Sequence, residues 1–175
     1  MEKQTEEIKV IFLHDVGVGT TNIISVLCGL PFSSSYLSTL SNYCLPYSVM
    51  IKGNKYLLNL WDTIGQEKLR PLTKIFIRNS EIVIFVYDIT NQQTFKELDN
   101  WIVTAKEVVG DNAIFGIMGA KIDLIKNQKI SDKEAIKFAQ SKGMKLKYVS
   151  SKEDPKGIKD FIQELTNDYL LTKKL

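Results

Sequence analysis

Residues 10–22, V-I-F-L-H-D-V-G-V-G-T-T-N, decide the fold of this chain. The stretch opens with an apolar run, passes through a turn that contains Gly17 and Gly19, and enters a segment with apolar residues at helical spacing. The predicted order is therefore a strand, a glycine loop and a helix. We expect the strand at 8–13 and the helix at 20–30, which ends before Pro31.

The spacing of this stretch fits the phosphate-binding loop G-x-x-x-x-G-K-[ST], but two of the four signature residues differ. In that loop the glycines let backbone N–H groups close on an anion, the lysine reaches the terminal phosphates and the hydroxyl holds Mg²⁺. Here His14 stands at the first glycine, Gly19 at the last, Thr20 at the lysine and Thr21 at the hydroxyl. The spacing is intact and the positive charge is missing. The alternative is a strand-to-helix turn whose glycines serve steric needs only.

Length and composition fit one ordinary globular domain. The 175 residues are 44% apolar and 25% charged, which is enough for a well-developed core and one ligand cleft. We therefore expect residues 1–175 to form a single domain. The net charge of +3 is dispersed among acidic residues, and the pattern does not favour nucleic acid as a partner.

The cysteines and the termini predict a soluble protein of a reducing compartment. Cys28 and Cys44 occur without a signal peptide, so we expect both to pack as small apolar groups, with a disulfide between them as the alternative. No apolar run approaches the roughly 18 residues of a membrane span. The chain offers no myristoylation glycine and no prenylation cysteine. The expected location is the cytoplasm, with at most transient membrane association through partners.

The rest of the chain alternates strands with helices. The six apolar residues 82–87 show no alternation, which is typical of a strand covered on both faces. Lys52-Gly53-Asn54-Lys55 predicts a hairpin turn, and Pro46 places the first hairpin strand at a sheet edge. This order predicts a doubly wound, mostly parallel six-stranded α/β sheet with helices on both faces. Further strands are expected at 47–51, 56–61, 82–87, 113–118 and 145–149, and further helices at 70–78, 94–109, 131–142 and 157–171.

Polar residues follow three of these strands, where α/β sheets bind ligands. Asp62 can hold a water of Mg²⁺, the N–H of Gly65 can meet a terminal phosphate, and Gln66 can orient an attacking water. Asp123 can accept the paired N–H donors of guanine, and residues 150–152 follow the last strand. The alternative is that these are exposed polar turns.

In combination these motifs resemble the Ras-like small GTPases, and within them the Rab branch, over residues 8–171. The resemblance implies the small G-domain fold of the phosphate-loop nucleotide hydrolases and a guanine-nucleotide-dependent switch in vesicle trafficking, with GTP or GDP and Mg²⁺ as ligands. The family's W-D-T-A-G-Q-E, Y-x-S-T-I-G, V-Y-D-x-T, N-K-x-D and S-A-K correspond to W-D-T-I-G-Q-E at 61–67, Y-L-S-T-L-S at 36–41, V-Y-D-I-T at 86–90, A-K-I-D at 120–123 and S-S-K at 150–152.

The resemblance implies a role for each matching residue. Thr21 and Thr39 would ligate Mg²⁺ directly and Asp62 through water. Gln66 would position the hydrolytic water, and Asp123 would accept hydrogen bonds from guanine. Contacts with the nucleotide are then expected from Asp15, Val16, Gly17, Val18, Gly19, Thr20, Thr21, Asn22, Thr39, Gly65, Lys121, Asp123, Ser150, Ser151 and Lys152.

Departures from the family pattern predict weakened nucleotide binding and slow hydrolysis. Thr20 replaces the phosphate lysine, and one lost charge-assisted contact costs roughly 1.5–3 kcal/mol, about 10- to 150-fold in affinity. His14 would strain the backbone if its φ were positive. Ala120 removes the hydrogen bonds of the asparagine that ties the base loop to the phosphate loop. Ile64 places a branched side chain near the metal, and Ser41 replaces a glycine.

A second reading is a pseudo-GTPase, an interaction module that binds little or no GTP, either alone or as part of a tandem-domain product. Against it, a cation from Lys68, Arg70 or Lys74 can replace the lost lysine, although such positions commonly form a solvated helix face.

Effector and regulatory proteins are the expected partners, through the two switch loops. In the Rab branch an aromatic cluster contacts effectors, and its positions here are Cys44, Trp61 and Phe76, with Tyr36 in the first switch loop. Only two of the three cluster positions are aromatic, which puts the usual partners in doubt. The alternative is that Trp61 and Phe76 only pack on the sheet surface.

Overall fold

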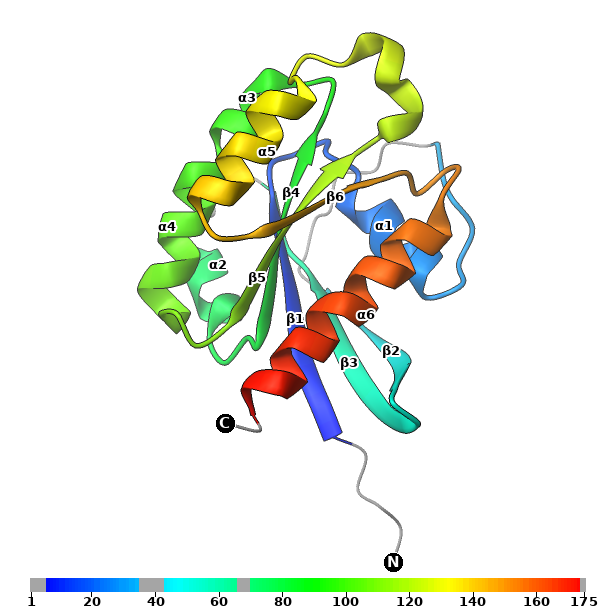
Figure 1. Ribbon diagram of the computed structural model, residues 1–175, viewed down its shortest axis with the longest axis vertical. Coiled ribbons are helices and arrows are strands. Elements are labelled where there is room, and N and C mark those ends of the chain that lie inside the picture. Colours follow the sequence, from blue (N-terminus) through cyan, green and yellow to red (C-terminus); the bar gives the residue numbers. More distant parts are fainter. Residues whose placement is uncertain (1–5, 35–42, 66–69, 174–175) are drawn as a thin grey trace, which may run out of the picture.

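The computed structural model describes residues 6–34, 43–65 and 70–173. They form a six-stranded sheet in the order β2-β3-β1-β4-β5-β6, with helices on both faces (Figure 1). Only β2 runs antiparallel to its neighbour, so the predicted doubly wound, mostly parallel sheet is confirmed. The strands are β1 Glu6–His14, β2 Tyr43–Ile51, β3 Asn54–Asp62, β4 Ile82–Asp88, β5 Ile114–Ala120 and β6 Lys145–Val149.

Two apolar cores lie on the two faces of the sheet. One packs α1 and α6 against the sheet around Phe12 and Phe161, and the other packs the remaining α-helices around Phe85 and Trp101 (Figure 1). None of the described helices combines the length and the apolar character that a membrane crossing needs. The helices are α1 Thr20–Leu27, α2 Arg70–Ile77, α3 Gln92–Lys96, α4 Leu98–Val109, the 3₁₀ helix η2 Ile122–Asn127, α5 Asp132–Ser141 and α6 Pro155–Thr172.

The predicted helix over 94–109 is wrong in its extent. The side chain of Asn91 accepts a hydrogen bond from the N–H of Gln93 at 3.0 Å, which starts α3 two residues earlier, and Glu97 separates α3 from α4. The last helix also starts early, because Asp154 accepts from the N–H of Gly157 at 2.9 Å and caps α6. In both cases a side chain that caps the helix determined where it begins.

The β2–β3 hairpin forms as predicted, with β2 at the sheet edge. Ile51 pairs with Asn54, so the turn consists of Lys52 and Gly53 alone. Both have positive φ, 50° and 79°, as the type I′ turn of a two-residue hairpin requires. Pro46 is tolerated within β2 because an edge strand leaves part of its backbone unpaired.

Both cysteines are free thiols. Cys28 is half-buried against the core and Cys44 is exposed, so the prediction that both pack as small apolar groups is right for Cys28 only.

The parallel strands carry the informative loops to one edge of the sheet. β1 ends at His14, β3 at Asp62, β4 at Asp88 and β5 at Ala120, and the pairing registers place these ends beside one another. Segments distant in sequence therefore meet at this edge.

Candidate functional site

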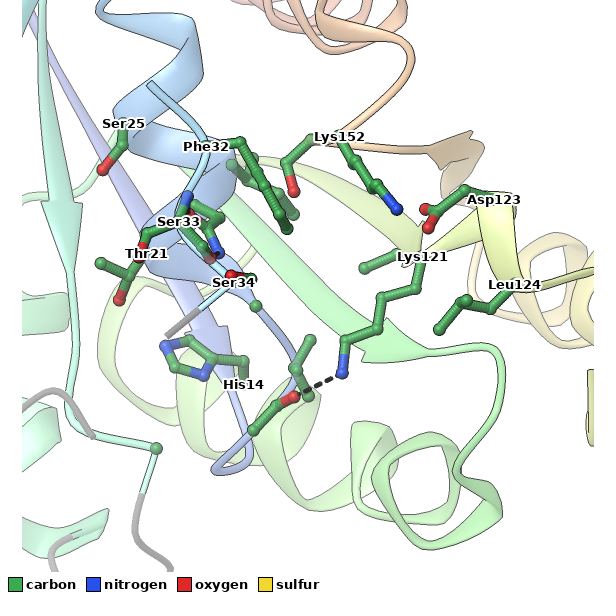
Figure 2. A pocket seen from close by; sticks show the side chains of 18 of the residues that line it. His14, Thr21, Ser25, Phe32, Ser33, Ser34, Lys121, Asp123, Leu124 and Lys152 are labelled. Atoms are coloured by element: carbon green, nitrogen blue, oxygen red, sulfur yellow. Dashed lines mark hydrogen bonds between the residues drawn. The ribbon is translucent and has the colours of Figure 1, made fainter. Parts of the chain in front are cut away.

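A cavity of about 550 Å³ lies at this edge of the sheet (Figure 2). The loop between β1 and α1 forms its floor, and residues 31–34, the end of β5 and the loop after β6 form its walls. The predicted nucleotide-binding residues that line it are Val16, Gly17, Val18, Gly19, Thr21, Asn22, Gly65, Lys121, Asp123, Ser151 and Lys152. The side chains of Asp15, Thr20 and Ser150 are not part of the lining. Thr39 and Gln66 lie outside the described residues.

The glycines of the loop are required by its conformation. Gly17 has φ of 82° and Gly19 has φ of 97°, a region that other residues adopt only with strain. Gly19 is the N-cap of α1, so the first N–H groups of that helix open toward the loop. A glycine loop at a helix N-terminus is suited to an anion. The steric explanation and the phosphate-binding explanation of the glycines therefore apply to the same turn.

Thr20, which replaces the phosphate lysine, is turned away from the cavity. Its side chain is 1% exposed, and its hydroxyl has no hydrogen-bond partner within the described part of the chain. A buried hydroxyl without a partner costs free energy and supplies nothing to a ligand. The predicted loss of the lysine contact is therefore not offset at this position.

His14 is a buried titratable residue beside the loop. Its Nδ1 lies 2.9 Å from the carbonyl oxygen of Asp15 and its Nε2 lies 3.3 Å from Oδ1 of Asp62. Both partners are acceptors, so the two contacts favour the doubly protonated, cationic form of the imidazole. Burial is the largest single effect and opposes this charge, but Asp62 and the carbonyls of Asp15 and Thr63 together raise the pKa of His14.

The backbone of His14 does not have a positive φ, so the strain considered from the sequence does not arise. The residue ends β1 as an ordinary extended residue. When it is protonated, His14 carries a positive charge within the same loop motif, in contact with the carboxylate of Asp62.

Asp62 stands at the centre of a buried polar group. It is fully buried, and its Oδ2 accepts a hydrogen bond from the hydroxyl of Thr21 at 2.6 Å. Tyr43 faces Asp62 across β2 and β3, and burial, followed by the charge of Asp62, raises the pKa of Tyr43. No sequence pattern indicated Tyr43 at this site.

The donor set of this group fits a magnesium ion. The Thr21 hydroxyl and the Asp62 carboxylate are the oxygen ligands that Mg²⁺ prefers, directly or through water. Thr39, the third predicted ligand, is not among the described residues. Across the described ranges no three His, Cys, Asp or Glu side chains gather as a metal cage.

Lys121 joins the base end of the cavity to the glycine loop. Its Nζ donates to the carbonyl oxygen of Gly17 at 2.8 Å (Figure 2) and pairs with Oδ2 of Asp88 at 2.7 Å. Its backbone is left-handed, with φ of 67°. Ala120 has no polar side chain, so the loss of the asparagine's hydrogen bonds stays a prediction, and Lys121 provides a connection of its own between the two loops.

Asp123 presents a carboxylate to the cavity from η2. Its Oδ1 accepts a hydrogen bond from the hydroxyl of Ser150 at 2.7 Å, which fixes its orientation. Ser150 thus acts behind the cavity wall, whereas Ser151 and Lys152 line it. A fixed carboxylate is suited to paired N–H donors of a planar base.

The cavity lining includes apolar residues that were not predicted to contact the nucleotide, Phe32 and Leu124 among them. Phe32 and Leu124, each 40% exposed, extend into it from opposite sides (Figure 2). The signal for Phe32 was an aromatic residue in an otherwise Ser-rich loop after Pro31. Apolar faces of this kind are suited to a planar ring.

Asp15 is held by a residue far along the chain. Its Oδ1 accepts a hydrogen bond from the indole nitrogen of Trp101 on α4 at 2.8 Å. The carboxylate of Asp15 therefore anchors the loop to the helix layer, while its carbonyl accepts from His14. No local pattern could show this pairing, because 86 residues separate the partners.

Gly65 lies directly on the glycine loop. A Cβ at this position would come within 2.7 Å of the carbonyl carbon of Asp15 and 2.8 Å of the nitrogen of Val16. Only glycine fits such a close approach of two backbones.

The cations proposed to replace the lysine do not reach the cavity where they can be located. Lys74 pairs with Glu107 of α4 at 2.6 Å. Lys68 and the side chain of Arg70 lie outside the described residues.

The predicted effector cluster gathers on the β2–β3 side of the sheet. Cys44 pairs with Trp61 across the two strands, and the ring centroids of Trp61 and Phe76 are 5.9 Å apart. Lys9 adds a cation 5.1 Å from the Trp61 ring. Tyr36 is outside the described residues. The geometry is equally compatible with packing on the sheet surface.

Comparisons with known proteins agree with this architecture. The family model described as Ras family matches residues 9–170. The chain is 32% identical to the Ras-related protein Rab-21 of Bos taurus over 98% of its own length and 77% of that protein. It is 33% identical to Rab-21 of Homo sapiens, covering 95% and 74% of the two chains. It is 36% identical to the Ypt/Rab-type GTPase Rab7 of Neurospora crassa, covering 78% and 69%. The chain therefore belongs to the Rab branch of the Ras-like small GTPases.

Proposed function

We propose that the chain is a guanine-nucleotide switch of vesicle trafficking whose nucleotide binding is weakened and whose hydrolysis is slow. The observation that carries the proposal is the shared cavity: one wall is a glycine loop at a helix N-terminus and another presents the oriented carboxylate of Asp123. An anion site and an acceptor for paired N–H donors on one cavity match the two ends of a guanine nucleotide.

At the base end, Asp123 would accept the N–H donors of guanine, with Phe32 and Leu124 as apolar walls. At the other end, the backbone of residues 16–19 would enclose the phosphates. Bound Mg²⁺ would neutralise phosphate charge, held by Thr21 directly and by Asp62 through water.

The predicted weakness rests on Thr20. Its buried hydroxyl cannot replace an ammonium group on the phosphates, and the cation of His14 is engaged by Asp62. Family resemblance gives Gln66 and Thr39 the roles of water-positioning residue and metal ligand. The loss of charge at the phosphates is expected to slow hydrolysis more than binding, because negative charge grows at the transferred group.

A second candidate is the pseudo-GTPase, the same fold serving as an interaction module. The observation that favours it is that Asp62, the predicted metal acid, is already paired with both His14 and Thr21. In either case the partners are expected at the switch loops and at Cys44, Trp61 and Phe76, in the cytoplasm or transiently at a membrane.

The experiment that separates the two begins with denaturation of freshly purified protein and chromatography of the released nucleotide. Equilibrium titration with GDP and with ADP in Mg²⁺ follows, at micromolar protein, with Asp123→Ala as the matched variant. We expect GDP to bind more tightly than ADP and Asp123→Ala to abolish the difference. Absence of released guanine nucleotide together with no binding of GDP would reject the switch and leave the interaction module.

A further inference from the structure

Asn22 makes a two-bond clamp between α1 and the segment that carries Phe32. Its Nδ2 donates to the carbonyl oxygen of Ser33 at 2.8 Å, and its Oδ1 accepts from the N–H of Ser33 at 2.9 Å. One side-chain amide therefore satisfies both backbone groups of one residue. Residues 31–34 belong to no helix or strand, and the two bonds from Asn22 tie Ser33 to α1.

Ser33 lies between two residues of the cavity wall. Phe32 precedes it and Ser34 follows it, and all three line the cavity (Figure 2). Phe32 is 40% exposed, so tertiary packing encloses it only in part. Because Asn22 fixes the peptide groups on either side of Ser33, it restricts where the ring of Phe32 can lie.

We propose that Asn22 is a positioning residue that fixes Phe32 as a wall of the base end before a nucleotide binds. The inference rests on the proposed function, since it concerns how the same cavity holds a guanine nucleotide. A wall that is already ordered removes part of the entropic cost of binding, which offsets part of the affinity lost with the phosphate lysine. The planar aromatic ring then contacts the planar base.

The chemistry of the clamp requires an asparagine. Its side-chain amide carries one donor and one acceptor, which match the carbonyl and the N–H of Ser33. An aspartate would keep the acceptor but place its second oxygen against the carbonyl oxygen of Ser33. An alanine would lose both bonds. Asn22→Asp therefore removes one of the two bonds, whereas Asn22→Ala removes both.

The test is a double-mutant cycle on the full chain, with the dissociation constant of GDP measured by calorimetry in Mg²⁺. We expect Asn22→Ala and Phe32→Ala each to raise this constant on the order of 10-fold, as the loss of a hydrogen-bonded or stacking contact does. If Asn22 acts through Phe32, the double variant is no weaker than Phe32→Ala alone. For Asn22→Asp, the increase in the logarithm of the dissociation constant of GDP is expected to be at least half of the increase for Asn22→Ala.

Inorganic pyrophosphate, tested as a competitor of GDP, provides the second readout. The affinity of Asn22→Ala for pyrophosphate is expected to stay within 2-fold of that of the unmodified chain, because the clamp acts on the base end. A general loosening of the site would instead lower the affinity for pyrophosphate. The control is Asn59→Ala, which removes an exposed amide that bonds to Glu7 at 3.0 Å. It should change neither affinity.

The proposal would be overturned if the fold-increases in the dissociation constant of the two single variants multiplied in the double variant. Asn22 would then contact the ligand directly. An unchanged GDP affinity in Asn22→Ala, or equal losses for GDP and pyrophosphate, would overturn it as well. No GDP binding by the unmodified chain is a different result: it rejects the proposed function, and the positioning role falls with it.

Discussion

Nε2 of His14 lies 3.3 Å from Oδ1 of Asp62, where β1 and β3 end side by side. The other oxygen of Asp62 accepts from Thr21, and the other nitrogen of His14 faces the carbonyl of Asp15. Asp62 therefore links the strand end to α1, and His14 links it to the glycine loop. The pairing makes this end of the sheet sensitive to the charge of a single residue.

Stability should fall as the pH rises through the pKa of His14. The folded-state pKa is raised above the usual value of about 6.5, so this stabilisation is complete below pH 6.5 and is lost as pH rises through the folded value. Groups facing the ring are Asp62 and the carbonyls of Asp15 and Thr63, with Tyr43 beside Asp62. Thermal unfolding in EDTA, without nucleotide, measures the effect.

His14 is the only histidine of the chain, so the comparison has a clean control. His14→Asn should lack the loss of stability above pH 6.5 while keeping the acid-side behaviour that carboxylates cause. Identical pH profiles of the two proteins would contradict the charged pair.

Thr20→Lys should tighten GDP binding. The ammonium group restores one charge-assisted contact, worth about 10- to 150-fold in affinity, and the substitution also removes a buried hydroxyl without a partner. Thr20→Met has similar length and no charge. An equal gain in both variants would mean that relief of the hydroxyl, and not the charge, is responsible. No gain in either would show that the loop register assigned here is wrong.

Gly65→Ala should weaken GDP binding. The added methyl group would lie 2.7–2.9 Å from backbone atoms of Asp15 and Val16, so one of the two backbones must move. Overpacking of this kind costs about 1–3 kcal/mol. Binding affinity and thermal unfolding are measured together, and unchanged values of both would show that the two backbones separate without cost.

Lys121→Met should lower the free energy of unfolding by about 1–3 kcal/mol. The substitution removes the cation that pairs with Asp88, whose side chain is only 5% exposed, and it removes the hydrogen bond to the carbonyl oxygen of Gly17. The second variant, Lys121→Met with Asp88→Asn, should recover part of the loss because it removes the uncompensated charge. Chemical denaturation measures both. The control is Lys126→Met, because Lys126 lies on η2 and makes no ion pair with the described residues. An equal loss of stability in the control would contradict the role assigned to Lys121.

The fold could be predicted because its signals are local. A few neighbouring residues are enough to predict each of three features: the buried strand from the unbroken apolar run at 82–87, the loop after β1 from its glycines, and the edge strand from Pro46. Helix starts were harder, since Asn91 and Asp154 determine them through single side-chain bonds to the backbone. Such bonds can shift the first residue of a helix away from the position that helix propensity favours, and whether they form depends on the local backbone geometry.

The cavity was predicted from motifs, but its internal bonds were not. His14 and Asp62 are 48 residues apart, and Lys121 and Gly17 are 104 apart. Each bond depends on which strand ends are neighbours, and this is known only once the sheet order is known. His14, which the sequence presents only as the loss of a glycine, makes contacts in the structure with Asp15 and Asp62.

The bond between Trp101 and Asp15 has a practical consequence. Trp101 is 1% exposed and its indole nitrogen is bound to the glycine loop, so its fluorescence depends on the state of that loop. Trp61 is the second tryptophan of the chain; it lies on β3 and packs, partly buried, against the same apolar core as Trp101. Replacing Trp61 with phenylalanine leaves one emitting indole. The protein thus carries its own optical probe, and we expect its emission to report occupancy of the cavity without any label.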